Sequence, residues 1–107
     1  MGLYSTIKTA VRCGNCGWEG EVEIQFKFGN LYAHEYSVGD PVVWGRTQVG
    51  EPGLTRVVVE GVGACPRCDA EISCDIFLVH DVIQKVQTSR GEYDYFHGEG
   101  DYVILER

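Results

Sequence analysis

The sequence has few basic residues, and it does not gather them into a cluster. The sequence contains nine lysines and arginines and 16 aspartates and glutamates, which gives a formal net charge of −7. A protein that binds nucleic acid usually carries a basic surface, because contacts with phosphates supply much of the affinity. Nucleic-acid binding is therefore possible but not favoured. For that function, distant arginines would have to converge on folding, namely Arg12, Arg46, Arg56 and Arg67.

Long apolar runs and a leader are also missing from the sequence. No stretch approaches the roughly 20 apolar residues that cross a bilayer. The first residues, MGLYSTIKTAV, lack the basic end and continuous apolar core of a signal peptide. We therefore expect a cytoplasmic domain with no membrane partner.

Recognisable catalytic motifs are absent as well. The sequence contains no phosphate-binding loop, no dinucleotide fingerprint and no serine or cysteine nucleophile motif. The three histidines are His34, His80 and His97; His80 stands beside Asp81, and His97 lies in an acidic loop near Glu99 and Asp101. A histidine next to a carboxylate can act as a base or a metal ligand, but such a pair is common by chance. We expect surface histidines and no enzyme.

The composition indicates a mainly β fold. Valine and isoleucine together number 20, whereas alanine, leucine and methionine number 10. Branching at Cβ favours the pleated surface of a strand. A chain of 107 residues has the usual length of one domain, so we expect a single domain over residues 1–107.

Four of the five cysteines form two C-x-x-C pairs, which are Cys13 with Cys16 and Cys65 with Cys68. Each pair lies in a short turn that we call a knuckle (residues 13–18, CGNCGW, and 65–70, CPRCDA). Two such turns can aim four thiolates at one tetrahedral metal ion. The pattern predicts a four-cysteine site that holds Zn²⁺, with iron as the less favoured metal.

Two other uses of these cysteines remain open but fit less well. A thioredoxin-type redox pair should begin a helix, whereas EVEIQFKF follows the first knuckle and alternates like a strand. A secreted disulfide frame would have an even number of cysteines and an export signal, whereas this sequence has five cysteines and its first residues do not resemble a signal peptide. The fifth cysteine, Cys74, lies in the alternating stretch EISCDIFL and is predicted to be buried.

The two knuckles resemble those of zinc ribbons and of rubredoxin-like domains, in which a small or turn residue often follows each cysteine pair. Gly17 matches that pattern, whereas Asp69 departs from it but tolerates a left-handed backbone. The resemblance covers about residues 8–28 and 57–79, and it implies a class of metal site rather than an activity. It implies two hairpins, each with a knuckle at its tip.

The remaining segments elaborate this pair of hairpins. Residues 29–56 form an insertion with several glycines and two prolines, and its run Val42–Trp44 suggests a strand or a small hairpin. Tyr32, Tyr36 and Trp44 could belong to the core or to a partner-binding surface. In the C-terminal extension, about residues 80–107, the stretch 80–88 fits a strand or a helix, with the strand favoured. DYVILER predicts a final strand.

These features predict a small non-enzymatic zinc-binding domain that acts as a protein–protein interaction or adaptor module. A nucleic-acid-binding zinc ribbon is the first alternative. A rubredoxin-like carrier of single electrons, with iron at the four cysteines, is the second.

Overall fold

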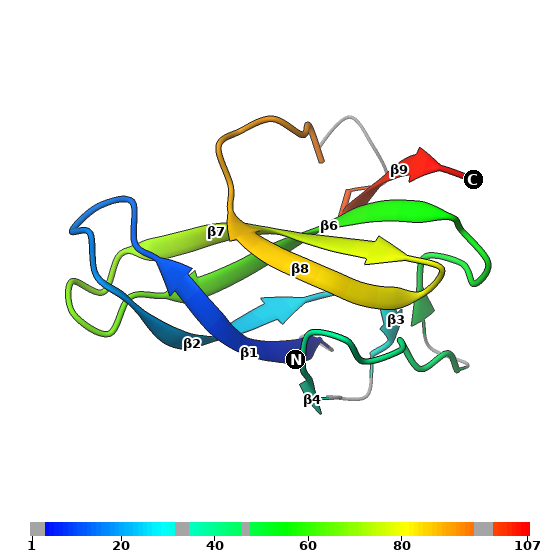
Figure 1. Cartoon of the computed structure of the whole chain (residues 1–107), viewed down its shortest axis with the longest axis horizontal. Helices are drawn as coiled ribbons and strands as arrows, with labels where there is room; N and C mark the ends of the chain where they lie inside the picture. Colours follow the sequence, from blue (N-terminus) through cyan, green and yellow to red (C-terminus); the bar gives the residue numbers. More distant parts are fainter. Residues whose placement is uncertain (1–3, 32–34, 46–47, 96–99) are drawn as a thin grey trace.

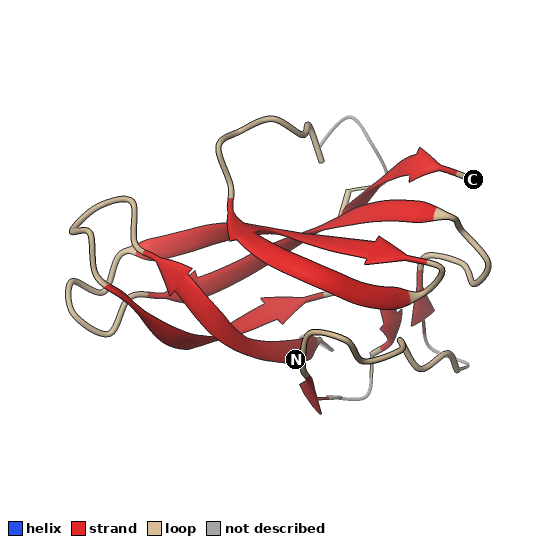
Figure 2. Cartoon of the chain, viewed as in Figure 1, coloured by secondary structure: helices blue, strands red, loops and turns tan. Residues whose placement is uncertain are grey.

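The computed structural model describes residues 4–31, 35–45, 48–95 and 100–107, and all regular elements in these ranges are β-strands (Figure 1, Figure 2). The mainly β fold predicted from the composition is therefore confirmed. Tyr32, His34, Arg46 and His97 lie outside the described residues.

Two long antiparallel hairpins form the framework, as the sequence predicts. Strand β1 (Ser5–Arg12) pairs with β2 (Glu19–Phe26), and the first knuckle joins them. Strand β6 (Arg56–Ala64) pairs with β7 (Glu71–Val79) around the second knuckle. Each hairpin therefore ends in one cysteine pair.

The two hairpins are neighbours in one sheet of order β4-β1-β2-β6-β7-β8, and β9 is also paired with β6. Strand β4 (Glu35–Tyr36) lies parallel to β1, and β8 (Val82–Thr88) lies antiparallel to β7. One edge of β6 is shared: its knuckle end pairs with β2, and its other end pairs with β9 (Tyr102–Glu106).

The sheet curls until its two ends approach each other, so that β1 lies beside β8 (Figure 1). The hydroxyl of Thr88 in β8 donates a hydrogen bond of 2.9 Å to the carbonyl oxygen of Arg12 in β1. At the other end of β8, the Ile83 N–H donates to the Asp40 carbonyl oxygen at 3.0 Å. The Val42 N–H donates to the Asp81 carbonyl oxygen at 2.7 Å. These bonds satisfy backbone groups at an otherwise open edge.

The core fills the inside of the curl with alternate residues of the long strands. In β2, Ile24 is fully buried and its neighbours Glu23 and Gln25 are exposed. In β7, the predicted inward face of Ile72, Cys74, Ile76 and Leu78 is buried. Burying one such side chain contributes about 1.5–3 kcal/mol, so the alternation fixes which face of each strand points inward.

The insertion contains a small second sheet, in which β3 (Gly29–Asn30) pairs with β5 (Gln48–Val49). The run Val42–Trp44 is not a regular strand. Its backbone is hydrogen-bonded to two different segments instead of one neighbouring strand. The Val43 carbonyl oxygen accepts a hydrogen bond from the Asn30 N–H, and the Val42 N–H donates one to the Asp81 carbonyl oxygen. Tyr36 is buried, and the Trp44 ring packs on Phe28 with centroids 5.3 Å apart, so both belong to the core.

The C-terminal extension belongs to the main sheet. The strand favoured over residues 80–88 is confirmed as β8, and DYVILER contains β9. His80 and Asp81 form the two-residue turn between β7 and β8, with φ angles of 48° and 65°. His80 is exposed there, as expected for a surface histidine.

Candidate metal centre

The pairing of β2 with β6 brings the two knuckles to the same end of the molecule. Gln25 pairs with Val62 and Phe26 with Gly61, which places the hairpins side by side. A Cβ added at Gly61 or Gly63 would lie 2.6 Å from the side chain of Ile24. Glycine at these two positions therefore allows the first hairpin to lie close against the second.

Both knuckles have the same backbone hydrogen bonds. In the first, the Cys13 N–H donates to the Trp18 carbonyl oxygen at 2.7 Å, and the Gly17 N–H donates to the Cys13 carbonyl oxygen at 3.0 Å. In the second, the Cys65 N–H donates to the Ala70 carbonyl oxygen at 2.9 Å, and the Asp69 N–H donates to the Cys65 carbonyl oxygen at 2.9 Å. The two turns are thus equivalent supports for their cysteines.

The residue after each cysteine pair has a left-handed backbone, with φ of 77° at Gly17 and 61° at Asp69. Glycine adopts this conformation without steric cost, and aspartate is one of the few other residues that tolerate it. The interpretation of Asp69 as a substitute for the usual small residue agrees with this geometry.

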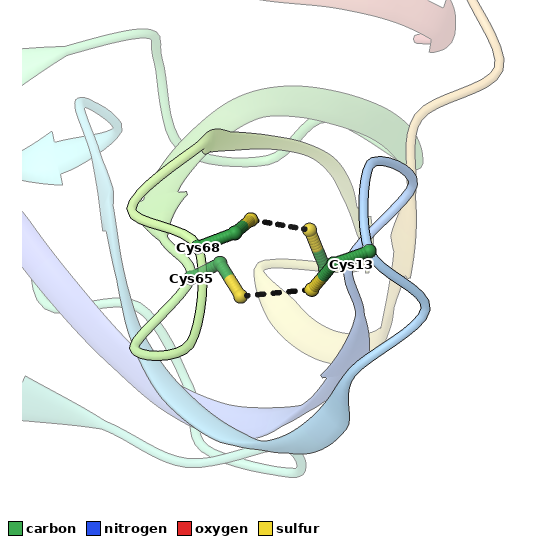
Figure 3. A group of neighbouring side chains, drawn as sticks. Cys13, Cys65 and Cys68 are labelled. Carbon is green, nitrogen blue, oxygen red and sulfur yellow. Dashed lines mark hydrogen bonds between the residues drawn. The ribbon is translucent and has the colours of Figure 1, made fainter.

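The four thiols converge between the knuckles, and their sulfur atoms all lie within 4.8 Å of one another. The Sγ atoms of Cys13 and Cys68 are 3.7 Å apart, and those of Cys16 and Cys65 are 3.6 Å apart. Figure 3 shows Cys13 of one knuckle facing Cys68 of the other, with Cys65 beside Cys68. With a Zn–S bond of about 2.3 Å, two sulfurs of a tetrahedral site are about 3.8 Å apart. The cysteines therefore fit a tetrahedral metal ion.

Polar groups around the thiols favour thiolate formation unequally. The Asn15 side-chain amide and then the Ala70 N–H donate to Cys68 and lower its pKa to about 6. The pKa of Cys16 is raised to about 11 although the Trp18 N–H lowers it, because burial and the neighbouring thiols have the opposite effect. A metal ion must displace the remaining thiol protons, and its binding then becomes stronger at higher pH.

Asn15 is a site residue that the sequence argument missed. It lies between the two cysteines of the first knuckle, and its Nδ2 donates to Cys68 Sγ in the second knuckle at 3.4 Å. The sequence contains a hint, because an amide side chain between two ligands is positioned to serve the site. The sequence separation of 53 residues conceals which sulfur it reaches.

The surroundings of the centre shield one side of it. Cys13 and Cys65 are each only 1% exposed, whereas Cys16 and Cys68 are partly exposed. The partly buried Trp18 packs against the core and lies over Gly20, where an added Cβ would be 2.5 Å from the indole ring. Four protein sulfurs fill a tetrahedral shell and leave no position for a reactive water. With Zn²⁺ and four thiolates, the centre would carry a charge of −2.

The fifth cysteine is separate from this centre. Cys74 is fully buried on the inward face of β7, as predicted. Burial, and then the charge of Asp75, raise the pKa of Cys74 to about 11. A thiol that keeps its proton at neutral pH is a poor nucleophile, so Cys74 packs as an apolar side chain.

The arginines proposed for a nucleic-acid surface do not form one cluster in the described part of the chain. Arg67 lies in the second knuckle, whereas Arg56 begins β6 at the other end of a nine-residue strand. Such a strand is about 27 Å long. Arg12 lies at the first knuckle and is 3.8 Å from Glu19.

The described residues include no helix that is long and apolar enough to cross a membrane. Comparisons with the models of known protein families, with curated proteins and with solved structures give no match.

Proposed function

We propose that this chain is a small non-enzymatic zinc-binding domain in which the metal has a structural role. The observation that carries this proposal is the convergence of four thiols from two matching knuckles at tetrahedral spacing. A shell filled by protein sulfurs supplies binding energy rather than an activated water. The metal then joins the two hairpins at the end of the sheet where β2 and β6 share few backbone pairs.

Zinc is the metal that we propose, with iron as its rival. Four-cysteine zinc sites are a common structural class, and the same sulfurs also accept iron. Elemental analysis of the protein purified from its host, together with its visible absorption spectrum, tests the choice. One zinc per chain and a colourless solution are expected. One iron per chain, with visible absorption that bleaches on reduction, would instead identify a one-electron carrier.

We further propose that the domain acts as an interaction or adaptor module for a protein partner. Two apolar side chains of the insertion support this role, since Val38 is 46% exposed and Val43 is 44% exposed. Both lie near Tyr36, whose hydroxyl oxygen accepts a hydrogen bond from the Val43 N–H. A net charge of −7 favours a partner with a basic surface.

Affinity capture from the host, followed by identification of the partner and reconstitution with purified proteins, tests the module. The double variant Val38→Ser/Val43→Ser should weaken the reconstituted complex at least tenfold. The matched control Leu105→Ser removes an apolar side chain of similar exposure from β9 and should retain binding. Equal binding by the double variant and the wild type would overturn the use of this surface.

A further inference from the structure

A groove of about 660 Å³ lies on the outer face of the β7–β8 hairpin, away from the metal centre. Its lining includes Gln84, Lys85 and Gln87 of β8, and Arg90, Glu92 and Tyr93 of the segment that follows β8. Its basic residues are Arg56, Lys85 and Arg90, with Glu92 as the acidic residue among the described lining residues. We call this feature the basic groove.

The basic groove continues toward the first knuckle. A smaller hollow of about 360 Å³ shares Gln87 and Arg90 with it and adds Arg12. Four of the nine basic residues in the sequence therefore border one continuous strip. This concentration contrasts with the net charge of −7 of the whole chain. It includes Arg12 and Arg56 of the four arginines considered in the sequence, and it adds Lys85 and Arg90.

The cations in the strip are available to a ligand. In the part of the chain that the structure describes, neither Lys85 nor Arg90 has a carboxylate at ion-pair distance. Arg56 is 3.9 Å from a carboxylate oxygen of Glu106, and Arg12 is 3.8 Å from one of Glu19; all four side chains are more than half exposed. Exposed ion pairs of this kind contribute little free energy and are readily exchanged for a stronger anionic partner.

Two β-bulges shape the same groove. In β8, Leu78 pairs with Ile83 and Phe77 with Lys85, so Gln84 is the additional residue. In β9, the corresponding additional residue is Leu105. Both bulged residues line the groove. A bulge redirects the side chains that follow it and is frequent beside binding sites; here it leaves Lys85 above the ring of Phe77, with Nζ 4.8 Å from the centroid.

Aromatic rings and amide groups accompany the cations. The rings of Phe77 and Tyr93 pack edge to face, with centroids 5.9 Å apart, and both line the groove. Arginine and lysine bind phosphate, aromatic side chains stack on bases, and glutamine amides can pair with base edges. A simple anion or an acidic peptide would use the cations but would not need the rings.

We propose that the basic groove binds a nucleotide, either free or as one unit of a single-stranded nucleic acid. The phosphates contact Arg90 and Lys85, and the base lies against Tyr93. The volume of the groove is within the range of about 300–1,000 Å³ that is typical of small-ligand sites. This site is separate from the proposed partner surface at Val38 and Val43, and its test does not depend on that surface.

The test is a fluorescence-anisotropy titration of the zinc-loaded full chain with a labelled decathymidylate at several salt concentrations. Thymidine monophosphate and a heparin fragment serve as competitors. We expect binding of the oligonucleotide that weakens as salt increases. In Lys85→Gln/Arg90→Gln the affinity at low salt should fall at least tenfold. The slope of the logarithm of affinity against the logarithm of salt concentration should decrease in magnitude by about 1.4, because each phosphate contact with a single strand contributes about 0.7 to it.

Matched variants separate the groove from general electrostatics. Lys8→Gln/Lys27→Gln makes the same change of charge outside the groove and should alter the affinity less than about twofold. Tyr93→Leu should weaken the oligonucleotide more than heparin, because only the oligonucleotide has bases to stack. Circular dichroism of each variant checks that it is folded.

Displacement of the oligonucleotide by the mononucleotide would identify a free nucleotide as a sufficient ligand. Oligonucleotide binding that the mononucleotide does not displace would identify a strand. The proposal is overturned if neither binds, or if the control pair loses as much affinity as the groove pair. It is also overturned if heparin competes equally well and Tyr93→Leu has no effect.

Discussion

Individual residues around the four cysteines differ in how well the sequence identifies them. The spacing of Cys13, Cys16, Cys65 and Cys68 predicts their convergence, because a short turn fixes the two sulfurs of each pair. Asn15 could not be assigned in this way, since its bond to Cys68 depends on how the two knuckles face each other. The burial of Cys74 was predictable from alternation alone.

Replacing Asn15 tests the role of the bond between the knuckles. Asn15→Ala removes the amide donor that helps to lower the pKa of Cys68, so the metal must bind a less stabilised thiolate. We expect the affinity for Zn²⁺ to fall by about tenfold, the lower end for groups that support metal ligands. Competition with a chromophoric chelator measures this change. Gly14→Ala is the control, because no atom lies within 4 Å of the added Cβ.

The hydroxyl of Tyr95 has a buried partner on the outer face of β7. It donates to Asp75 Oδ1 at 2.7 Å, and Asp75 is fully buried, with no described partner for Oδ2. Tyr95→Phe leaves this carboxyl group without a donor and should lower the free energy of unfolding by about 1–3 kcal/mol. Urea denaturation of the zinc-loaded protein measures it. Tyr93→Phe removes a hydroxyl that has no hydrogen-bond partner among the described residues and should have little effect.

The raised pKa of Cys74 predicts that the folded protein loses stability at alkaline pH. Burial, and then the charge of Asp75, raise its pKa from 9.0 to about 11. Because the folded state holds this proton more tightly than the unfolded chain, the contribution to stability is complete below pH 9 and is lost as the pH rises toward 11. The urea midpoint of the zinc-loaded protein should decline over this interval. The urea midpoint of Cys74→Ala should decline less steeply with pH. Identical slopes for the variant and the wild type would refute Cys74 as the origin of the loss.

At the scale of strands, periodicity identifies the elements that have one buried face. The alternation of apolar and polar residues predicts β2 and β7, whereas the β-branched residues of β8 only favour a strand over a helix. The run Val42–Trp44 has a similar composition but is irregular, because its backbone bonds to both Asn30 and Asp81. Distant segments of the chain decide which neighbours a short apolar run contacts, so the local sequence does not predict whether the run becomes a strand.

Gly61 tests the close packing of β2 on β6. In Gly61→Ala the new Cβ would lie 2.6 Å from Ile24 and 3.0 Å from Ile76, and both side chains belong to the core. We expect a loss of about 1–3 kcal/mol in the free energy of unfolding, as for other overpacked cores. Thermal denaturation of the zinc-loaded variant measures the loss. Unchanged stability would mean that the two hairpins can separate without cost.

At the scale of the whole molecule, the sheet is curled so that β1 lies beside β8 (Figure 1). Both cysteine pairs lie at one end of this sheet, and the basic groove lies on its outer face. The sequence predicts two hairpins but not the curl. Closure depends on contacts such as that between Thr88 and Arg12, which are 76 residues apart. The packing of residues 89–95 over β7 through Tyr95 was likewise not predicted, since no periodic pattern marks that segment.

We expect the metal at the four cysteines to stabilise the whole domain. Structural zinc sites bind with about 10–16 kcal/mol in peptides, which is comparable to or larger than the net stability of a small domain, about 5–15 kcal/mol. Loss of the metal should therefore remove the native fold. Cys13→Ser removes one buried thiol from the centre, and Cys74→Ser is the matched control because it removes a buried thiol elsewhere.

The most direct measurement is the circular dichroism melting curve of the purified protein before and after removal of its metal, with metal content determined on the same samples. We expect the metal-free protein and Cys13→Ser to lose the cooperative transition, whereas Cys74→Ser keeps its metal and a transition that depends on it. A metal-free protein with an unchanged melting curve would contradict the structural role of the four-cysteine centre.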